Sequence, residues 1–197
     1  MKALEDIRQN RALDEGLLKA LNQYPLIDKL QEFVEESDIP RLMKMAADTG
    51  VDFVLAVSLL RKFDTRADVK SFFLEQWNQL NDLDHKLELM WRILDDEALD
   101  LSVHEDVYTF VRSNMERFVK ESVDWYGGVD RVLDVVRSRL SDPSFPRTKD
   151  WAYLCTATGS SDRSAATELV RSYAASKNSF LRKVVKEILH YLDEKYL

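Results

Sequence analysis

The sequence predicts an all-α fold, and three features of its 197 residues lead to this prediction. Five glycines and four prolines are too few to punctuate a series of short strands. Apolar residues recur every three or four positions along most of the chain, as on the buried face of a helix. No segment alternates apolar and polar residues in the way of a half-buried strand. We therefore expect about 10–11 antiparallel helices with short connections, in one domain spanning residues 1–197.

The first 80 residues are predicted to form a helical cap or a set of degenerate repeats. Apolar stripes predict five helices here, near residues 13–21, 25–34, 38–49, 51–59 and 65–80. Residues suited to helix starts stand at matching positions: Pro25, Ser37 or Asp38, Pro40, and Asp64 or Thr65. The third helix is expected to end at Thr49-Gly50.

The rest of the chain predicts six more helices, near residues 83–95, 102–122, 129–140, 146–157, 162–175 and 179–195. Ser102 and Glu105 have the spacing of a capping box, which would open one long helix ending at about Ser122. Gly127-Gly128 is the only double glycine, and we expect the clearest helix break there.

The last third contains an internal repeat. Residues 141–147 recur as residues 176–182, a shift of 35 positions, and the preceding helices match at a shift of 34. The segments VLDVVRSRLSDPSFPRTKDWAYLCTATG and AATELVRSYAASKNSFLRKVVKEILHYL resemble the HEAT-like family of α-helical repeats. The resemblance covers residues 129–195 as two repeats and residues 82–123 as a looser one.

That resemblance implies an α-solenoid of stacked helix hairpins. It also implies a ladder between repeats, built from an acidic or amide residue in each turn and a basic residue in each second helix. The positions that match are Asp142, Asn178, Arg147 and Arg182. From the residues alone, the two arginines are better explained as structural members of this ladder, paired with Asp142, Asp150 or another turn acid, than as binding residues.

Charge divides unevenly along the chain, whose formal net charge is −7. Residues 1–129 hold 16 basic and 26 acidic side chains, a net charge of −10, whereas residues 130–197 hold 12 and 9, a net charge of +3. Nine acids gather in residues 82–106, and four of them form the candidate site for a basic protein partner: Asp95, Asp96, Glu97 and Asp100. An ordinary solvated face would have the same composition.

Residues able to carry chemistry are sparse. His85, His104 and His190 show no spacing typical of a metal site, so neither a metal nor a cofactor is predicted. Cys155 is the only cysteine, which excludes an intramolecular disulfide and fits a reducing, cytoplasmic location. No apolar run is long enough to cross a membrane.

Five basic residues begin the second helices of the two repeats and would face the concave side of a solenoid: Arg147, Lys149, Arg182, Lys183 and Lys186. The three lysines are the more available for binding if the arginines are structural. The favoured function is a non-enzymatic protein–protein interaction or regulatory module of bacterial type, which uses the curved face of the array.

The alternative is an enzyme that acts on nucleic acid. Some HEAT-like proteins are alkylpurine DNA glycosylases, which place an aspartate and tryptophans in a basic groove. Asp150-Trp151, flanked by Arg147 and Lys149, is the segment with those ingredients. The acidic composition of the whole chain argues against extensive contact with phosphates.

Overall fold

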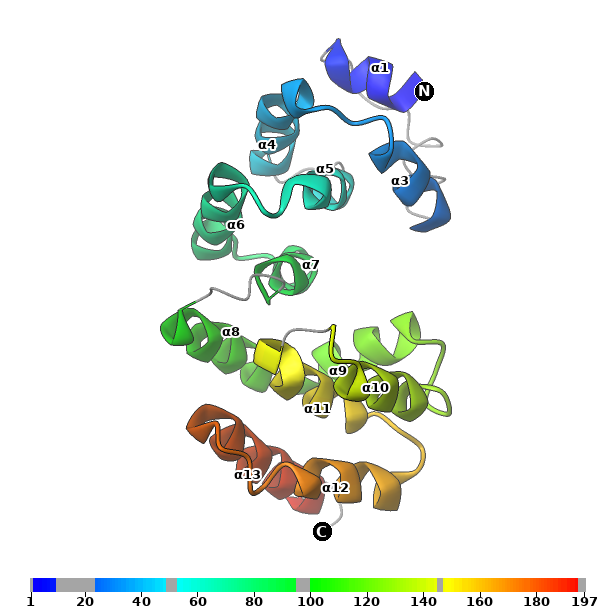
Figure 1. Ribbon diagram of the computed structural model, residues 1–197, viewed down its shortest axis with the longest axis vertical. Coiled ribbons are helices and arrows are strands. Elements are labelled where there is room, and N and C mark those ends of the chain that lie inside the picture. The colour runs from blue at the N-terminus through cyan, green and yellow to red at the C-terminus, as the bar shows by residue number, and fades with distance from the viewer. Residues whose placement is uncertain (1, 10–23, 49–52, 95–99, 145–146, 195–197) are drawn as a thin grey trace. The chain divides into compact units, whose positions relative to one another are not determined.

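The computed structural model describes residues 2–9, 24–48, 53–94, 100–144 and 147–194. These ranges contain twelve α-helices, three short 3₁₀ turns and no strand, which confirms the all-α class (Figure 1). Contacts divide the chain into two compact units, residues 1–96 (unit 1) and 97–197 (unit 2). The single domain predicted from the sequence stays a prediction. None of the helices described is long and apolar enough to cross a membrane.

Unit 1 is organised around one apolar helix. Its helices are α1 (Lys2–Arg8), α3 (Tyr24–Gln31), α4 (Ile39–Ala47), α5 (Phe53–Leu60), α6 (Ala67–Gln79) and α7 (Leu83–Leu94). Helices α3, α4 and α7 all pack against α5. Every side chain of α5 except that of Val54 is buried. The apolar runs predicted this core correctly, whereas the predicted helix at 13–21 and the helix end at Thr49-Gly50 lie outside the described residues.

One ion pair joins α1 to the start of α4. The Arg8 guanidinium donates to both carboxylate oxygens of Asp38 at 2.9 Å. The Glu35 backbone N–H donates to the same carboxylate, also at 2.9 Å. These bonds hold the pKa of Asp38 below its usual value, with the Arg8 hydrogen bond as the largest cause. Asp38 therefore stands at the N-cap position predicted for it, and Pro40 lies in the first turn of α4.

Unit 2 consists of six helices: α8 (Leu101–Ser113), α9 (Met115–Trp125), α10 (Val132–Ser141), α11 (Asp150–Ala157), α12 (Arg163–Ser172) and α13 (Ser179–Glu194). The single helix predicted over 102–122 is wrong, because the chain breaks at Asn114 into α8 and α9. The Asn114 side-chain amide donates to the Phe110 carbonyl at 2.9 Å and so closes the end of α8. The expected capping box is also displaced, since α8 begins at Leu101, before Ser102.

The turn after α9 has the double glycine predicted as a break. Gly127 and Gly128 have φ angles of 88° and 103°, in the region that glycine reaches without strain. The Gly128 N–H donates to the Val123 carbonyl at 2.9 Å, which closes the helix end. A second glycine contact lies nearby, where Gly159 packs against the side chains of Val119 and Val123.

Helix α11 is the centre of unit 2. All eight of its residues are buried, and α9, α10, α12 and α13 pack around it. Helix α8 covers a further side, because the Tyr108 ring meets Trp151 of α11 and Phe180 of α13 edge to face, with ring centroids 5.4 and 5.8 Å apart. The Tyr108 hydroxyl donates to the Glu187 carboxylate at 3.0 Å. Helix α8 therefore covers a face of α11 that would be exposed in an open array of stacked hairpins.

Candidate interaction surface

The first repeat arginine fastens its own hairpin turn. Arg147 lies in the 3₁₀ turn Arg147–Lys149, and its guanidinium donates to the backbone carbonyls of Leu140 and Asp142 at the end of α10. Its Nη1 atom also lies 3.8 Å from the Asp150 carboxylate. Arg147 therefore supplies partners to carbonyls that a helix end leaves unpaired.

The second repeat arginine has the same role 35 positions later. The Arg182 Nη1 atom donates to the carbonyls of Ser176 and Lys177, at 2.6 and 3.0 Å, after the end of α12. The Asn178 side chain caps α13 by accepting from the Leu181 N–H at 3.1 Å. The equivalent turn acid, Asp142, accepts from the Ser144 N–H at 2.9 Å.

These bonds give the internal repeat a physical meaning. In both hairpins an arginine that follows the turn binds the carbonyls that precede it. All the bonds found for Asp142, Asn178, Arg147 and Arg182 within the described residues stay inside one turn and its adjacent helix ends. The ladder between neighbouring repeats therefore stays a prediction. Within the described residues Arg147 lies near the turn acid Asp150, whereas Arg182 binds backbone carbonyls.

The three lysines proposed as binding residues separate into two groups. Lys183 and Lys186 are exposed on α13. Their place on the concave side of a solenoid stays a prediction. Lys149 is buried, with 5% of its surface exposed, and it has an interaction partner. Its aliphatic stem and ammonium are thus committed to the interior of the hairpin, so a binding role for Lys149 is not favoured.

Asp150 and Trp151, the ingredients of the enzymatic alternative, are also inside the protein. Asp150 is 7% exposed and Trp151 is 1% exposed. Burial raises the pKa of Asp150 to about 6, against the opposing effect of the Arg147 guanidinium. The Trp151 indole N–H has no partner among the described residues. Tyr108 and Phe180 cover the Trp151 ring, so this pair does not line an open groove.

The acidic cluster is described only in part. Asp95, Asp96 and Glu97 lie outside the described residues. Asp100 is exposed at the start of α8, and Glu105 and Asp106 lie on the exposed face of the same helix. Leu101 lies near these acids in the sequence and keeps 51% of its surface exposed, as do three other large apolar side chains of the described residues to a similar extent: Phe33, Trp125 and Val129. Sequence analysis missed Leu101 because helical spacing alone does not reveal which apolar residues lack a partner.

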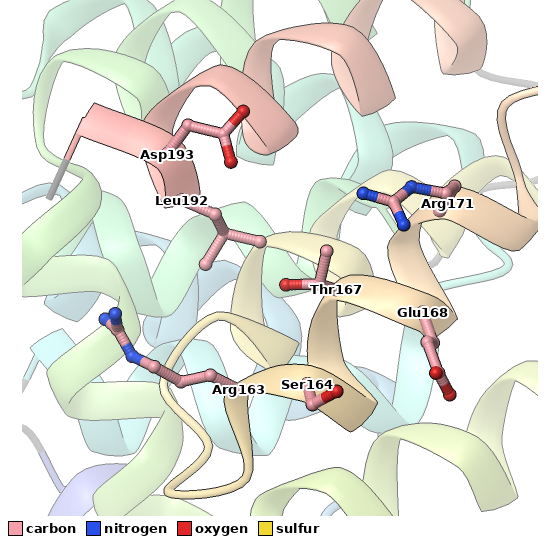
Figure 2. A pocket seen from close by; sticks show the side chains of 7 residues that line it. All are labelled: Arg163, Ser164, Thr167, Glu168, Arg171, Leu192 and Asp193. Atoms are coloured by element: carbon pink, nitrogen blue, oxygen red, sulfur yellow. The ribbon is translucent and has the colours of Figure 1, made fainter. Parts of the chain in front are cut away.

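Helices α12 and α13 border a polar pocket of about 350 Å³ (Figure 2). Arg163, Thr167 and Arg171 project into it from α12, and Leu192 and Asp193 close it from α13. A second pocket of about 280 Å³ shares Arg163 and Leu192 with it and extends to α9. Charges of both signs line these pockets, so they do not select a ligand by charge.

The cysteine and one of the histidines, Cys155 and His104, are buried. Burial raises the pKa of the Cys155 thiol and lowers the pKa of the His104 imidazole, so both stay neutral at pH 7. In the part of the chain that the structure describes, no three ligand-type side chains come together to hold a metal ion. A partner would therefore contact exposed side chains rather than Cys155 or His104.

The chain matches no family model. No curated protein and no solved structure matches it either.

Proposed function

We propose that this chain is a non-enzymatic module that binds another protein, with helix hairpins arranged as HEAT-like repeats. The observation that carries the proposal is the exposed face of α8. Asp100, Leu101, Glu105 and Asp106 are all exposed on the first two turns of this helix. A partner could bury the apolar Leu101 side chain while the carboxylates supply the polar rim of the contact.

The charge of this face selects a basic partner. Three carboxylates on one and a half turns of helix attract lysines and arginines and speed association at low ionic strength. Insertion of Leu101 into an apolar depression of the partner would supply affinity that is insensitive to salt. The two contributions together predict binding that weakens, but persists, when salt is raised.

The repeat arrangement is supported by the two equivalent hairpin turns. The α10–α11 and α12–α13 pairs share the same turn bonding, and α9, α11 and α13 pack in succession. A stack of this kind holds its surface rigid, which reduces the entropy lost on binding. The solenoid and the cytoplasmic location are parts of the proposal.

The test begins with capture from a native lysate, followed by isothermal titration of the purified captured protein. Reversal of the acids (Asp100→Lys, Glu105→Lys, Asp106→Lys) is expected to weaken binding at least tenfold at low salt. Leu101→Asp is expected to weaken it by a similar factor at high salt as well. The matched control reverses three exposed acids of unit 1, Glu32→Lys, Asp48→Lys and Glu75→Lys.

The outcome distinguishes docking at the α8 face from attraction by the overall net charge of the protein. Equal loss in the control variant would show that net charge, and not the α8 face, attracts the partner. A captured protein whose purified form binds both α8 variants as tightly as the original chain would refute the proposal. The enzymatic alternative is not proposed, since Trp151 and Asp150 are covered by neighbouring helices.

A further inference from the structure

The turns that follow α10 and α12 lie at the same edge of unit 2. Helix α10 packs on α11, and α12 packs on α13, across short turns that reverse the chain (Figure 1). The pKa of Tyr173, just after α12, is raised mainly by burial, but Asp150 and Arg147 at the start of α11 also influence it. These charges act over short distances, so the two turns are neighbours.

The opposite edge is fastened by its own hydrogen bonds. The Ser161 N–H donates to the Val129 carbonyl at 3.1 Å, and the Ser161 hydroxyl donates to the Asp130 carboxylate at 2.6 Å. This links the turn after α9 to the turn after α11. Unit 2 therefore has two distinct edges, and the chain passes between them with each helix.

Basic side chains outnumber acidic ones at the edge formed by the turns after α10 and α12. Residues 166–186 contain five basic side chains and one acid, and residues 135–154 contain four basic side chains and two acids. Arg139 and Lys149 are not exposed. The exposed cations within two helical turns of this edge, here called the basic edge, are Arg137, Arg147, Arg171, Lys177, Arg182, Lys183 and Lys186.

Two of these cations are held in position before any ligand arrives. Arg147 and Arg182 bind the turn carbonyls described above, and Arg147 keeps 53% of its side chain exposed. Among the described residues, Lys183 and Lys186 form no ion pair. The basic edge thus combines fixed guanidinium groups with mobile ammonium groups, both of which bind phosphate oxygens.

The composition of the edge favours a duplex over a single strand. Single strands are bound by stacking their bases on exposed aromatic rings. The large apolar side chains exposed in the described part of unit 2 are Leu101, Trp125 and Val129, and none belongs to the basic edge. A duplex keeps its bases stacked inside, so its phosphates can be bound without any aromatic ring.

B-form DNA has a wide major groove of about 12 Å, whereas that of duplex RNA is deep and narrow. We propose that the basic edge binds the phosphate backbone of double-stranded DNA, independently of sequence and of the α8 face.

Binding of this kind is weak and depends steeply on salt. Four to six phosphate contacts give a slope of about −4 to −5 in a plot of log affinity against log salt concentration. Backbone binding without base contacts has dissociation constants of about 10⁻⁴–10⁻⁶ M at physiological salt. The net charge of −10 on residues 1–129 lowers this affinity.

The experiment measures the fluorescence anisotropy of a labelled DNA duplex of about 20 base pairs, titrated with the protein at low and at moderate salt. The variant with Lys177→Glu, Lys183→Glu and Lys186→Glu is expected to lose at least tenfold in affinity. The matched control, Lys29→Glu, Lys44→Glu and Arg61→Glu, changes the net charge equally on exposed residues of unit 1 and is expected to lose less than threefold.

Two further sets of measurements control for loss of folding and for the choice of partner. Glutamine replacements at the same three lysines, with unfolding followed by circular dichroism, separate lost contacts from lost folding. A duplex RNA, a single strand of thymidines and a poly-glutamate peptide test the choice of partner. Tighter binding of any of these than of duplex DNA would overturn the proposal, as would equal losses in the basic-edge and control variants. The α8 variants are expected to retain full affinity for DNA, so each proposal can fail alone.

Discussion

Replacing Asp150 by asparagine is expected to stabilise the protein at alkaline pH and to leave its stability nearly unchanged at acid pH. Asp150 is buried at the start of α11, and burial raises its pKa from 3.8 to about 6. The folded protein therefore holds this proton more tightly than the unfolded chain does. Below pH 3.8 both states carry the proton, and the group has no effect on stability.

The size of the effect follows from the shift in pKa. As pH rises from 3.8 to about 6, the unfolded chain loses the proton first, so the free energy of unfolding falls. A shift of about two units corresponds to about 3 kcal/mol, at about 1.4 kcal/mol for each unit. Asparagine has the same shape and no charge, but it gives up the attraction of Arg147, so we expect a gain of about 1–3 kcal/mol at pH 8.

The assay is urea unfolding followed by circular dichroism, at about pH 4 and about pH 8. The control is Asp106→Asn, which removes an exposed carboxylate and is expected to change stability by less than about 0.5 kcal/mol at either pH. A loss of stability in Asp150→Asn at pH 8 would refute the reasoning. It would show that Arg147 stabilises the carboxylate by more than burial destabilises it.

Three other changes test the packing. Gly159→Ala is expected to lower the free energy of unfolding by about 1–3 kcal/mol in urea titrations, because its Cβ would lie 2.7 Å from the Val119 side chain; unchanged stability would contradict this close approach. Asp38→Asn is expected to lower the free energy of unfolding by about 1–3 kcal/mol at pH 7, because it weakens the ion pair with Arg8. If the same substitution lowers stability equally in an Arg8→Met background, the ion pair is not the cause. His104→Leu is expected to become more stable than the original chain as pH falls below 6.5. Burial lowers the pKa of His104, so in the original chain the unfolded state takes up the proton first and is favoured. Calorimetry measures the melting temperature of both proteins against pH, and two parallel curves would disprove this reasoning.

The sequence predicted helices well where apolar periodicity and a breaking residue coincide. Helix α7 begins and ends within one residue of its prediction, and α5 follows the apolar run that begins at Val51. The prediction failed at Asn114, because the apolar stripe continues through α8 and α9 and conceals the break. Periodicity reports which face is buried but not whether the axis bends.

The candidate site was predictable only in part. Lys183 and Lys186 were identified from their place in the repeat, and the structure leaves both exposed. Lys149 belongs to the equivalent turn yet is buried, and burial of one lysine and not another depends on tertiary packing that the repeat pattern does not report. Leu101 could not be identified in advance, because its exposure depends on what fails to pack against it.

The contact between Tyr108 and Glu187 has a consequence for how unit 2 assembles. In an open repeat array each hairpin touches only its neighbours, so hairpins unfold one after another and are gained or lost singly in evolution. Here a hydrogen bond spans 79 residues and joins the first helix of the unit to the last. Removal of α12 and α13 would uncover both Tyr108 and Trp151, so we expect the helices of this unit to unfold together rather than hairpin by hairpin.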